Sequence, residues 1–298
     1  MRITNLYVKG VGPFSRKREL FSLNTNDERV LITGISGSGK STALWAMAFL
    51  WRLLDANGQG REGDNPPTGS LAMHLSGLPQ GDVLVGFSAD PAFQEDISRR
   101  HENARPLFAT PEKPDALRGQ LSNGVPNMIL LDADFHPARR EEKVEDAWFL
   151  SDDDVKDVWP EALSRLNKAG NPNVPEAVSG INRLLVDKQL AFSSDGEVQV
   201  RLAGDQKHGP HQLSMGEKHL AVLCFSAACC LKSGGVLLLD EPAVHLHPSQ
   251  VMGLLTTLEG YCRKANAQLL LVSHNPAVWQ RYTELGLCVD LEVGHGGE

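Results

Sequence analysis

The sequence lacks several features that mark large functional classes. No apolar run approaches the ~20 residues that a membrane-spanning helix needs, and the first residues alternate like a strand instead of forming a secretion signal. Lys and Arg number 29 against 37 Asp and Glu, and the net charge of −8 argues against a generally basic nucleic-acid binder. The net charge does not exclude a basic patch on one face of the molecule. What remains is ordinary globular composition, 41% hydrophobic and 22% charged.

Cysteine is scarce, and its spacing argues against the common cysteine-based sites. The five cysteines form no C-x-x-C pair, and three of them fall in one apolar run with a helical pattern. We therefore expect reduced core residues in a cytoplasmic protein instead of redox or metal-binding thiols. The positions are Cys224, Cys229, Cys230, Cys262 and Cys288.

The most informative stretch runs from Val30 to Thr42. Its apolar start, residues 30–32, predicts a buried strand, and residues 43–50 predict a buried helix. The pattern G-x-x-x-x-G-K-S lies between them, where backbone N–H groups and the positive helix end can surround phosphates. An accidental glycine-rich turn is the alternative, which the flanking elements disfavour. The predicted nucleotide-binding residues are Gly34, Ser36, Gly37, Ser38, Gly39, Lys40, Ser41 and Thr42.

Two later strands end in residues that suit phosphate chemistry. The apolar run Val236–Leu239 is followed by Asp240 and Glu241, which could hold Mg²⁺ and activate a water molecule. A second apolar run ends at His274, which could donate a hydrogen bond to a phosphate or to the water. Taken singly, both patterns are also typical of ordinary surface residues.

A third motif, Leu213-Ser214-Met215-Gly216-Glu217, directly precedes a predicted helix. A Ser hydroxyl and a Gly N–H at a helix N-terminus can bind an anion. Ser214 and Glu217 have the spacing of a capping box, which is the structural alternative.

Hydrophobic periodicity predicts alternating strands and helices in the second half, hence a parallel sheet covered on both faces. Five prolines between Asp90 and Pro126 indicate that this stretch contains no long regular element. Residues 137–189 look helical and charged, with Ser151 as an N-cap, a turn at 171–173 and a helix over 174–188. The other expected strands are 2–9, 18–23, 71–76, 83–88, 128–132, 190–193, 198–202, 236–239, 269–272 and 287–292, and the other expected helices are 219–232, 248–264 and 276–282.

The order of these motifs resembles that of ABC-type ATPases, with Walker A at 34–41, signature at 213–217, Walker B at 236–241 and switch His274. The stretch D-E-P-A-V-H-L-H-P, residues 240–248, is similar to the D-E-P-x-x-x-L-H-P of the OLD- and RecF-like branch. Gly12-Pro13-Phe14, and Glu217 where a transporter has Gln, also look like that branch. The resemblance covers residues 1–55 and 195–298.

The resemblance implies an α/β P-loop NTPase fold of the ABC-ATPase head type, with a mostly parallel sheet, an antiparallel β subdomain and a helical insertion. It also implies a head-to-tail ATP-bridged homodimer or larger assembly in which Ser214, Gly216 and Glu217 act in trans. Ser41 and Asp240 would bind Mg²⁺, Glu241 would be the base, His274 the switch, and Lys40 a catalytic phosphate ligand. We expect one composite domain over 1–298, made of a P-loop lobe (1–134), a helical lid (135–189) and a C-terminal lobe (190–298).

The chain departs from the family pattern in two ways. No glutamine can be assigned to the Q-loop, for which Asp132, Asp134, Gln94 and Gln120 are the available residues. Residues 275–298 are also too few for the nuclease domain of OLD proteins. Any nuclease or toxin should therefore come from a separate effector chain.

Several functions stay open at this point. The favoured one is an Mg-ATP-hydrolysing ATPase that controls an effector in bacterial anti-phage defence. The alternatives are a DNA repair or segregation ATPase that clamps DNA, a non-hydrolysing ATP-dependent scaffold or sensor, and a transporter subunit, although no membrane contact is expected.

The remaining candidates are weaker. A metal site is disfavoured because the resemblance already accounts for two of its four histidines, which are His208, His211, His245 and His247. The basic clusters 16–18, 99–101 and 139–140 could contact nucleic-acid phosphates, but solvated surface charge is the simpler reading. The acidic run 141–157 is interpreted as a solvated helix face.

Overall fold

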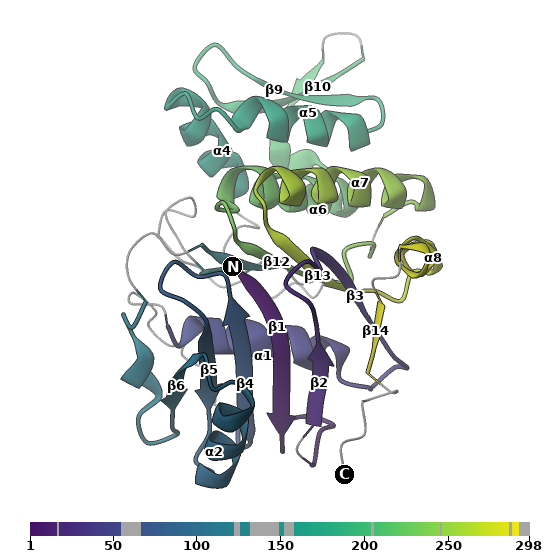
Figure 1. Ribbon diagram of the computed structural model, residues 1–298. Helices are drawn as coiled ribbons and strands as arrows, with labels where there is room; N and C mark the ends of the chain where they lie inside the picture. The colour runs from purple at the N-terminus through teal and green to yellow at the C-terminus, as the bar shows by residue number, and fades with distance from the viewer. Residues whose placement is uncertain are drawn as a thin grey trace.

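A six-stranded parallel sheet forms the centre of the molecule (Figure 1). The computed structural model describes residues 1–16, 18–54, 67–121, 126–131, 149–151, 158–203, 206–244, 246–285 and 288–291. The predicted buried parallel sheet is confirmed, since its apolar strands are covered on both faces. In spatial order the strands are β14 (Cys288–Asp290), β3 (Arg29–Thr33), β13 (Gln268–Val272), β12 (Val236–Asp240), β7 (Met128–Leu131) and β8 (Phe149–Ser151).

The sheet separates two hydrophobic cores. Leu237 and Leu271 belong to the core that contains α6 (Met215–Phe225) and α7 (Pro248–Lys264), whereas Leu238 and Leu270 belong to the core around α1 (Lys40–Arg52). Alternation along a strand causes this division, because successive side chains point to opposite faces. Helices α1 and α6 therefore lie on opposite faces of the sheet, as Figure 1 shows.

A second sheet covers α1 from the other side. Its strand order is β2 (Arg18–Ser22), β1 (Arg2–Lys9), β4 (Ser70–Ser76), β5 (Val83–Phe87) and β6 (Arg105–Ala109), and only the β5–β6 pair is parallel. The strands predicted at 2–9 and 18–23, and at 71–76 and 83–88, thus form two antiparallel hairpins. Met47 and Leu50 of α1 share one core with Leu6 and Met73 of this sheet.

The expectation that prolines exclude long regular elements between residues 90 and 126 was wrong. Helix α2 (Pro91–Arg100) begins at a proline, where a helix needs no intrahelical N–H bond, and Asp90 caps it by accepting from the N–H groups of Ala92 and Phe93. Pro106 lies in β6, an edge strand, where a missing N–H is tolerated. A 3₁₀ turn, Pro114–Leu117, follows.

The middle of the chain also differs from expectation. Residues 149–151 form a strand that Ser151 ends, while residues 152–157, where the helix after Ser151 was predicted, and most of the acidic run lie outside the described residues. The helix predicted to reach Lys188 is α5 (Val174–Leu184). Its C-cap, Leu185, is already extended, and Lys188 opens the next strand. That strand is β9 (Lys188–Phe192), which forms a small antiparallel sheet with β10 (Val198–Leu202) and β11 (Lys207–His208).

Helix α4 (Trp159–Lys168) and α5 pack into the same core as α6 and α7. The division into parts at 134 and 189 stays a prediction. Helix α6 begins four residues before the predicted start at 219 and continues into a π-helical turn, Ser226–Cys230. Helix α7 has the predicted bounds, and α8 (Pro276–Glu284) ends two residues later than expected. Among the described residues, no helix is long and apolar enough to cross a membrane.

The cysteines of α6, its π-helical turn and α7 behave as core residues. Cys224 and Cys262 are buried, and burial raises the pKa of both thiols to about 12. A thiol with that pKa stays protonated at neutral pH, so it is a poor nucleophile and metal ligand.

Candidate functional site

The loop between β3 and α1 has the backbone of a phosphate cradle. Gly34, Gly37 and Gly39 have φ angles of 145°, 81° and 95°, a region that side chains disfavour. A Cβ on Gly34 would lie 2.5 Å from Ser38 Oγ, and one on Gly39 would lie 2.3 Å from Phe14 Cζ. Conformation therefore favours glycine at all three positions, and close packing adds a second requirement at Gly34 and Gly39.

Lys40 is the first residue of α1, and its side chain turns back along this loop. It is 5% exposed, and its ammonium donates to the carbonyl oxygens of Gly34 and Ile35, both at 2.8 Å. The positive charge is thus held inside the loop, where the phosphates of a nucleotide would lie.

The start of α1 fits a bound anion. Gly39 is the N-cap in a left-handed conformation, no side chain caps the helix, and its first turn contains no acidic residue. Ser38 Oγ is buried without a hydrogen-bond partner, so the cradle contains a polar atom that a phosphate oxygen could satisfy. Ser41 is exposed in the first turn, where its hydroxyl suits Mg²⁺.

Strand register brings the other motif residues to the same edge. Asp240 is paired with Val272 across β12 and β13, and Val272 is paired with Ile32 across β13 and β3. The carboxyl ends of three strands thus place the P-loop, Asp240-Glu241 and His274 side by side. Three motifs that are far apart in the sequence therefore meet at one edge of the sheet.

The Glu241 carboxylate is fixed by the segment that follows β13. Its Oε2 accepts from the His274 N–H at 3.0 Å and from Ser273 Oγ at 3.3 Å. Its Oε1 is buried without a hydrogen-bond partner and lies 3.8 Å from His274 Nε2. Glu241 also has a φ of 49°, which costs about 1 kcal/mol for a residue with a side chain. One oxygen is thus anchored while the other can accept a proton.

The signature residues lie at the start of α6, on the other face of the sheet. Ser214 caps the helix by accepting from the Glu217 N–H at 3.3 Å, and Glu217 Oε2 accepts from the Ser214 N–H at 2.8 Å. The capping box that the sequence offered as the structural alternative is present. Ser214 is exposed, so the arrangement leaves it accessible to a second molecule.

Comparison with known families decides the identity of this fold. Residues 110–278, more than half of the chain, match the family model described as "AAA domain, putative AbiEii toxin, Type IV TA system". The chain belongs to this family. The matched region of this AAA-domain protein includes the signature, Asp240, Glu241 and His274, and it begins after the P-loop.

Two curated relatives match a shorter stretch of the AAA-domain protein. It is 41% identical over 77 residues to the thiamine import ATP-binding protein ThiQ of Photorhabdus laumondii, which is 26% of this chain and 32% of ThiQ. The ThiQ of Histophilus somni is 38% identical over 65 residues, 22% of this chain and 29% of ThiQ. The chain thus spans about a third of the length of the curated relatives it matches.

Solved structures support the fold alone. An SMC head bound to the C-winged helix domain of ScpA superposes with a TM-score of 0.52 and 17% identity, covering 94% of this chain and 92% of that one. The SMC head domain from Thermotoga maritima has a TM-score of 0.49, 19% identity and the same coverages. The AAA-domain protein therefore has the P-loop fold of ABC-type ATPases and SMC heads, with a parallel sheet flanked by helices and a separate antiparallel sheet.

Several residues that support the site were not found from the sequence. Lys188 of β9 forms an ion pair with Glu217 at 2.8 Å. Burial alone would raise the pKa of Glu217, but hydrogen bonds from Lys188 and Ser214 hold this pKa below its ordinary value. His219 of α6 contacts the Pro242 carbonyl oxygen. Such contacts join residues that are far apart in the sequence, so periodicity does not reveal them.

A buried acid holds the helix that follows His274. Glu259 of α7 is 3% exposed and accepts from Arg281 of α8 at 2.9 and 2.6 Å, and from Arg29 of β3 at 3.3 Å. Burial alone would raise the pKa of Glu259, but these guanidinium groups hold its pKa below the ordinary value. The ion pairs fix α8 against the strand that leads into the P-loop.

Other predicted candidates do not join the site. Gln94 donates to the Ser88 carbonyl and Gln120 accepts from Arg105, so both serve local structure, while Asp132 and Asp134 lie outside the described residues. The Q-loop residue thus stays unassigned. His247 caps α7, whereas His245 lies outside the described residues.

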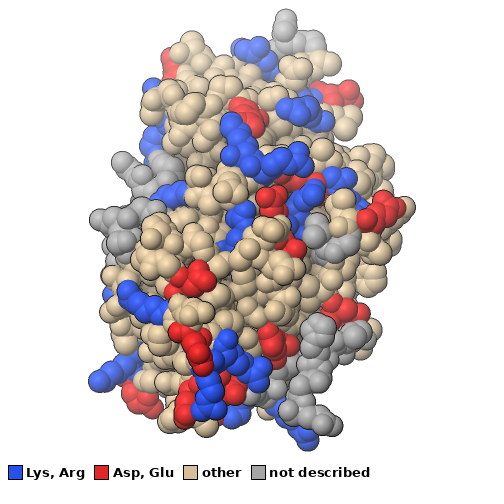
Figure 2. Space-filling view, viewed as in Figure 1, with Lys and Arg blue, Asp and Glu red and all other residues tan. Residues whose placement is uncertain are grey.

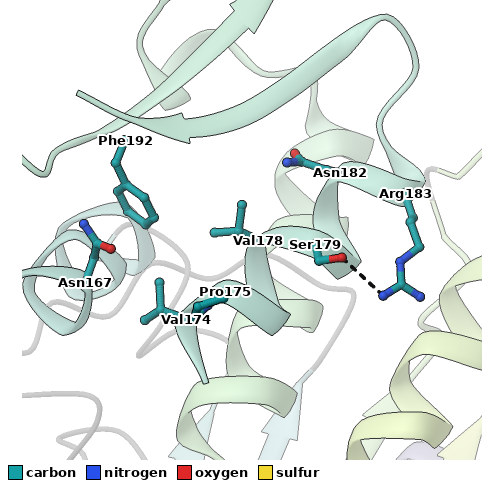
Figure 3. A pocket seen from close by; sticks show the side chains of 8 residues that line it. All are labelled: Asn167, Val174, Pro175, Val178, Ser179, Asn182, Arg183 and Phe192. Carbon is teal, nitrogen blue, oxygen red and sulfur yellow. Dashed lines mark hydrogen bonds between the residues drawn. The ribbon is translucent and has the colours of Figure 1, made fainter. Parts of the chain in front are cut away.

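A separate pocket of about 620 Å³ lies among α4, α5 and β9. Figure 3 shows apolar side chains around it, with Arg183 at one side bonded to Ser179. None of the motif residues lines it, so it is distinct from the nucleotide site. Its lining residues are Asn167, Val174, Pro175, Val178, Ser179, Asn182, Arg183 and Phe192.

Proposed function

We propose that this protein binds Mg-ATP in the loop of residues 34–42 and hydrolyses it within a nucleotide-bridged pair of identical chains. The observation that carries the proposal is the shared strand edge, where the P-loop lies beside Glu241, whose unbonded Oε1 is 3.8 Å from His274 Nε2. A buried carboxylate oxygen without a donor suits acceptance of a proton from an attacking water molecule.

Each part of the site has a role in this reaction. Lys40 and the loop N–H groups bind the phosphates, Ser41 and Asp240 would hold Mg²⁺, and Mg²⁺ would neutralise charge on the β- and γ-phosphates. Glu241 accepts the proton, and His274 orients the water or the γ-phosphate. Ser214, Gly216 and Glu217 of the second chain complete the site, since α6 lies across the sheet from α1.

Replacement of the base tests this proposal. Glu241→Gln should lower the rate of hydrolysis by at least ~10²-fold, the usual effect of losing a general base, while ATP-dependent dimers persist. Glu284→Gln, an exposed acid at the end of α8, is the matched control and should hydrolyse at the wild-type rate. If the wild type shows no turnover with or without partner proteins, the enzyme proposal is wrong.

We further propose that the chain belongs to the OLD- and RecF-like branch and that its nucleotide state controls a separate effector, a nuclease or a toxin, in the cytoplasm. The D-E-P-A-V-H-L-H-P stretch supports the branch, and the toxin named in the family description supports a setting in bacterial defence. A nuclease or toxin gene beside this one, with phage protection that Glu241→Gln abolishes, would support this setting. Protection that persists without the neighbouring gene would contradict it.

DNA clamping is the second candidate function, supported by the general resemblance of the motifs to RecF-like proteins. Figure 2 shows basic and acidic side chains interspersed on the visible face, and Arg99 and Arg100 are paired with Glu95 and Asp96. Lys17, Arg139 and Arg140 lie outside the described residues. Salt-dependent binding of duplex DNA that ATP strengthens would favour this function over effector control.

A further inference from the structure

Helix α6 contains a buried histidine that reaches the turn next to Glu241. His219 lies five residues after Ser214 and is 4% exposed. Its Nε2 lies 3.2 Å from the carbonyl oxygen of Pro242, the residue that follows Glu241. One side chain thus connects the helix that carries the signature with the turn that carries the proposed base.

The chemistry of this contact fixes its direction. A carbonyl oxygen only accepts, so His219 Nε2 carries the proton and donates. Pro242 is buried, and a buried carbonyl needs a donor. The turn itself is tight, since Glu241 has a φ of 49° and the Val244 N–H donates to the Glu241 carbonyl at 3.0 Å. Displacement of the Pro242 carbonyl would therefore rotate the Pro242–Ala243 peptide, which lies inside the turn that the Glu241 carbonyl and the Val244 N–H close.

We infer that His219 is a positioning residue that couples the two nucleotide sites of the dimer. This inference rests on the proposed function, in which Ser214 serves the nucleotide of the partner and Glu241 serves the chain's own nucleotide. A shift of α6 when Ser214 engages the partner's nucleotide moves the donor of the Pro242 carbonyl. The contact thereby transmits occupancy of one site to the base of the other.

Two substitutions separate the hydrogen bond from the volume of the ring. His219→Phe keeps an aromatic ring and removes the donor, whereas His219→Gln retains an N–H that can reach the carbonyl. The control is His211→Phe, an exposed histidine in the short turn before the signature. Thermal unfolding of all three variants reports any general loss of stability.

The first measurement does not depend on hydrolysis. Hydrogen exchange of the peptide 241–246 should rise roughly tenfold in His219→Phe, as expected when one buried hydrogen bond is lost. His219→Gln and His211→Phe should keep wild-type exchange, and peptides of β9 and β10 should not change in any variant. Unchanged exchange at 241–246 in His219→Phe would overturn the inference.

The second measurement tests the functional consequence. His219→Phe should lower kcat at least ~10-fold, because misplacing a catalytic group by about 1 Å is costly. KM for ATP should stay unchanged, because α1, the helix that follows the P-loop, packs on the other face of the sheet from α6. His219→Gln should recover most of the rate. If the wild type hydrolyses ATP and His219→Phe does so at full rate, the positioning role is refuted and the proposed function stands. If the wild type is inactive, the proposed function fails, and the exchange data still decide whether His219 holds the turn.

Discussion

The molecule presents two helix N-termini to phosphate chemistry, and they are built differently. Helix α1 starts from a left-handed glycine, Gly39, without a side-chain cap or an acidic first-turn residue. Helix α6 starts from Ser214 and closes its own capping box through Glu217, whose charge is paired with Lys188. The α1 terminus has no side-chain cap, whereas the α6 terminus satisfies the N–H groups of Ser214 and Glu217 within the chain.

This difference suits the two helix N-termini to different kinds of phosphate binding. The open end of α1 keeps the positive field of the helix dipole and adds Lys40, so it can bind an anion by itself. At α6, the Glu217 carboxylate compensates the dipole, so Ser214 gains little by binding a free anion. An ATP phosphate already held by another chain is the ligand that suits such a terminus.

The strongest test of this comparison disables each terminus in turn. Lys40→Ala should weaken ATP binding by more than ~100-fold, because the loop loses its charge, and hydrolysis should vanish with it. Ser214→Arg should leave ATP affinity within about twofold and lower hydrolysis by more than ~100-fold, because the proposed function assigns Ser214 to the nucleotide of a second chain. Equilibrium binding and steady-state turnover measure the two effects.

Mixing the two variants tests whether one ATP site contains residues of both chains. Lys40→Ala and Ser214→Arg chains together should restore at most one of two sites. Gln212→Arg, which places the same charge on a nearby exposed position, should behave as the wild type. Full activity from Ser214→Arg alone would refute a site shared between chains.

A second test concerns the glycine start of α1. Gly37→Ala places a Cβ where no atom lies within 4 Å, so only its φ of 81° opposes the change, at about 1–2 kcal/mol. Gly39→Ala has the same kind of φ penalty and also places its Cβ 2.3 Å from Phe14 Cζ. We expect the free energy of unfolding to fall by about 2–5 kcal/mol in total. Urea unfolding compares the two, and equal losses would mean that Phe14 moves aside freely.

The sequence predicted most of the parallel sheet, and the P-loop, Glu241 and His274 that it proposed as site residues lie at one edge of that sheet. Runs such as Val236–Leu239 and the acids after them are local signals, and parallel strands bring their carboxyl ends to one edge. Proline was misread because its effect depends on position: Pro91 opens a helix and Pro106 lies in an edge strand. The strand at residues 149–151 is three residues long, which is too short for periodicity to reveal.

The supporting contacts of the site could not be predicted, because they depend on tertiary structure. His219 and Pro242 are 23 residues apart, and Lys188 and Glu217 are 29 apart. Nothing in either local pattern distinguishes these residues from surface charge or from ordinary core. The left-handed φ of Glu241 is likewise hidden, since Glu has no preference for that conformation.

The smallest predicted effect isolates the charge at the α6 terminus. Glu217→Gln keeps an oxygen for the capping box, because Gln also serves at that position, and removes only the ion pair with Lys188. We expect the free energy of unfolding to fall by about 0.5–1 kcal/mol at neutral pH, and salt should reduce this difference. Since the fold lowers the pKa of Glu217, the contribution of this group to stability is present above its unfolded pKa of about 4.3 and disappears as the pH falls through its folded pKa.

Wild type and Glu217→Gln should therefore differ in free energy of unfolding at pH 7 and converge in acid. Lys188→Met should follow the same profile, and a difference that persists in acid would show that the carboxylate acts through geometry instead of charge.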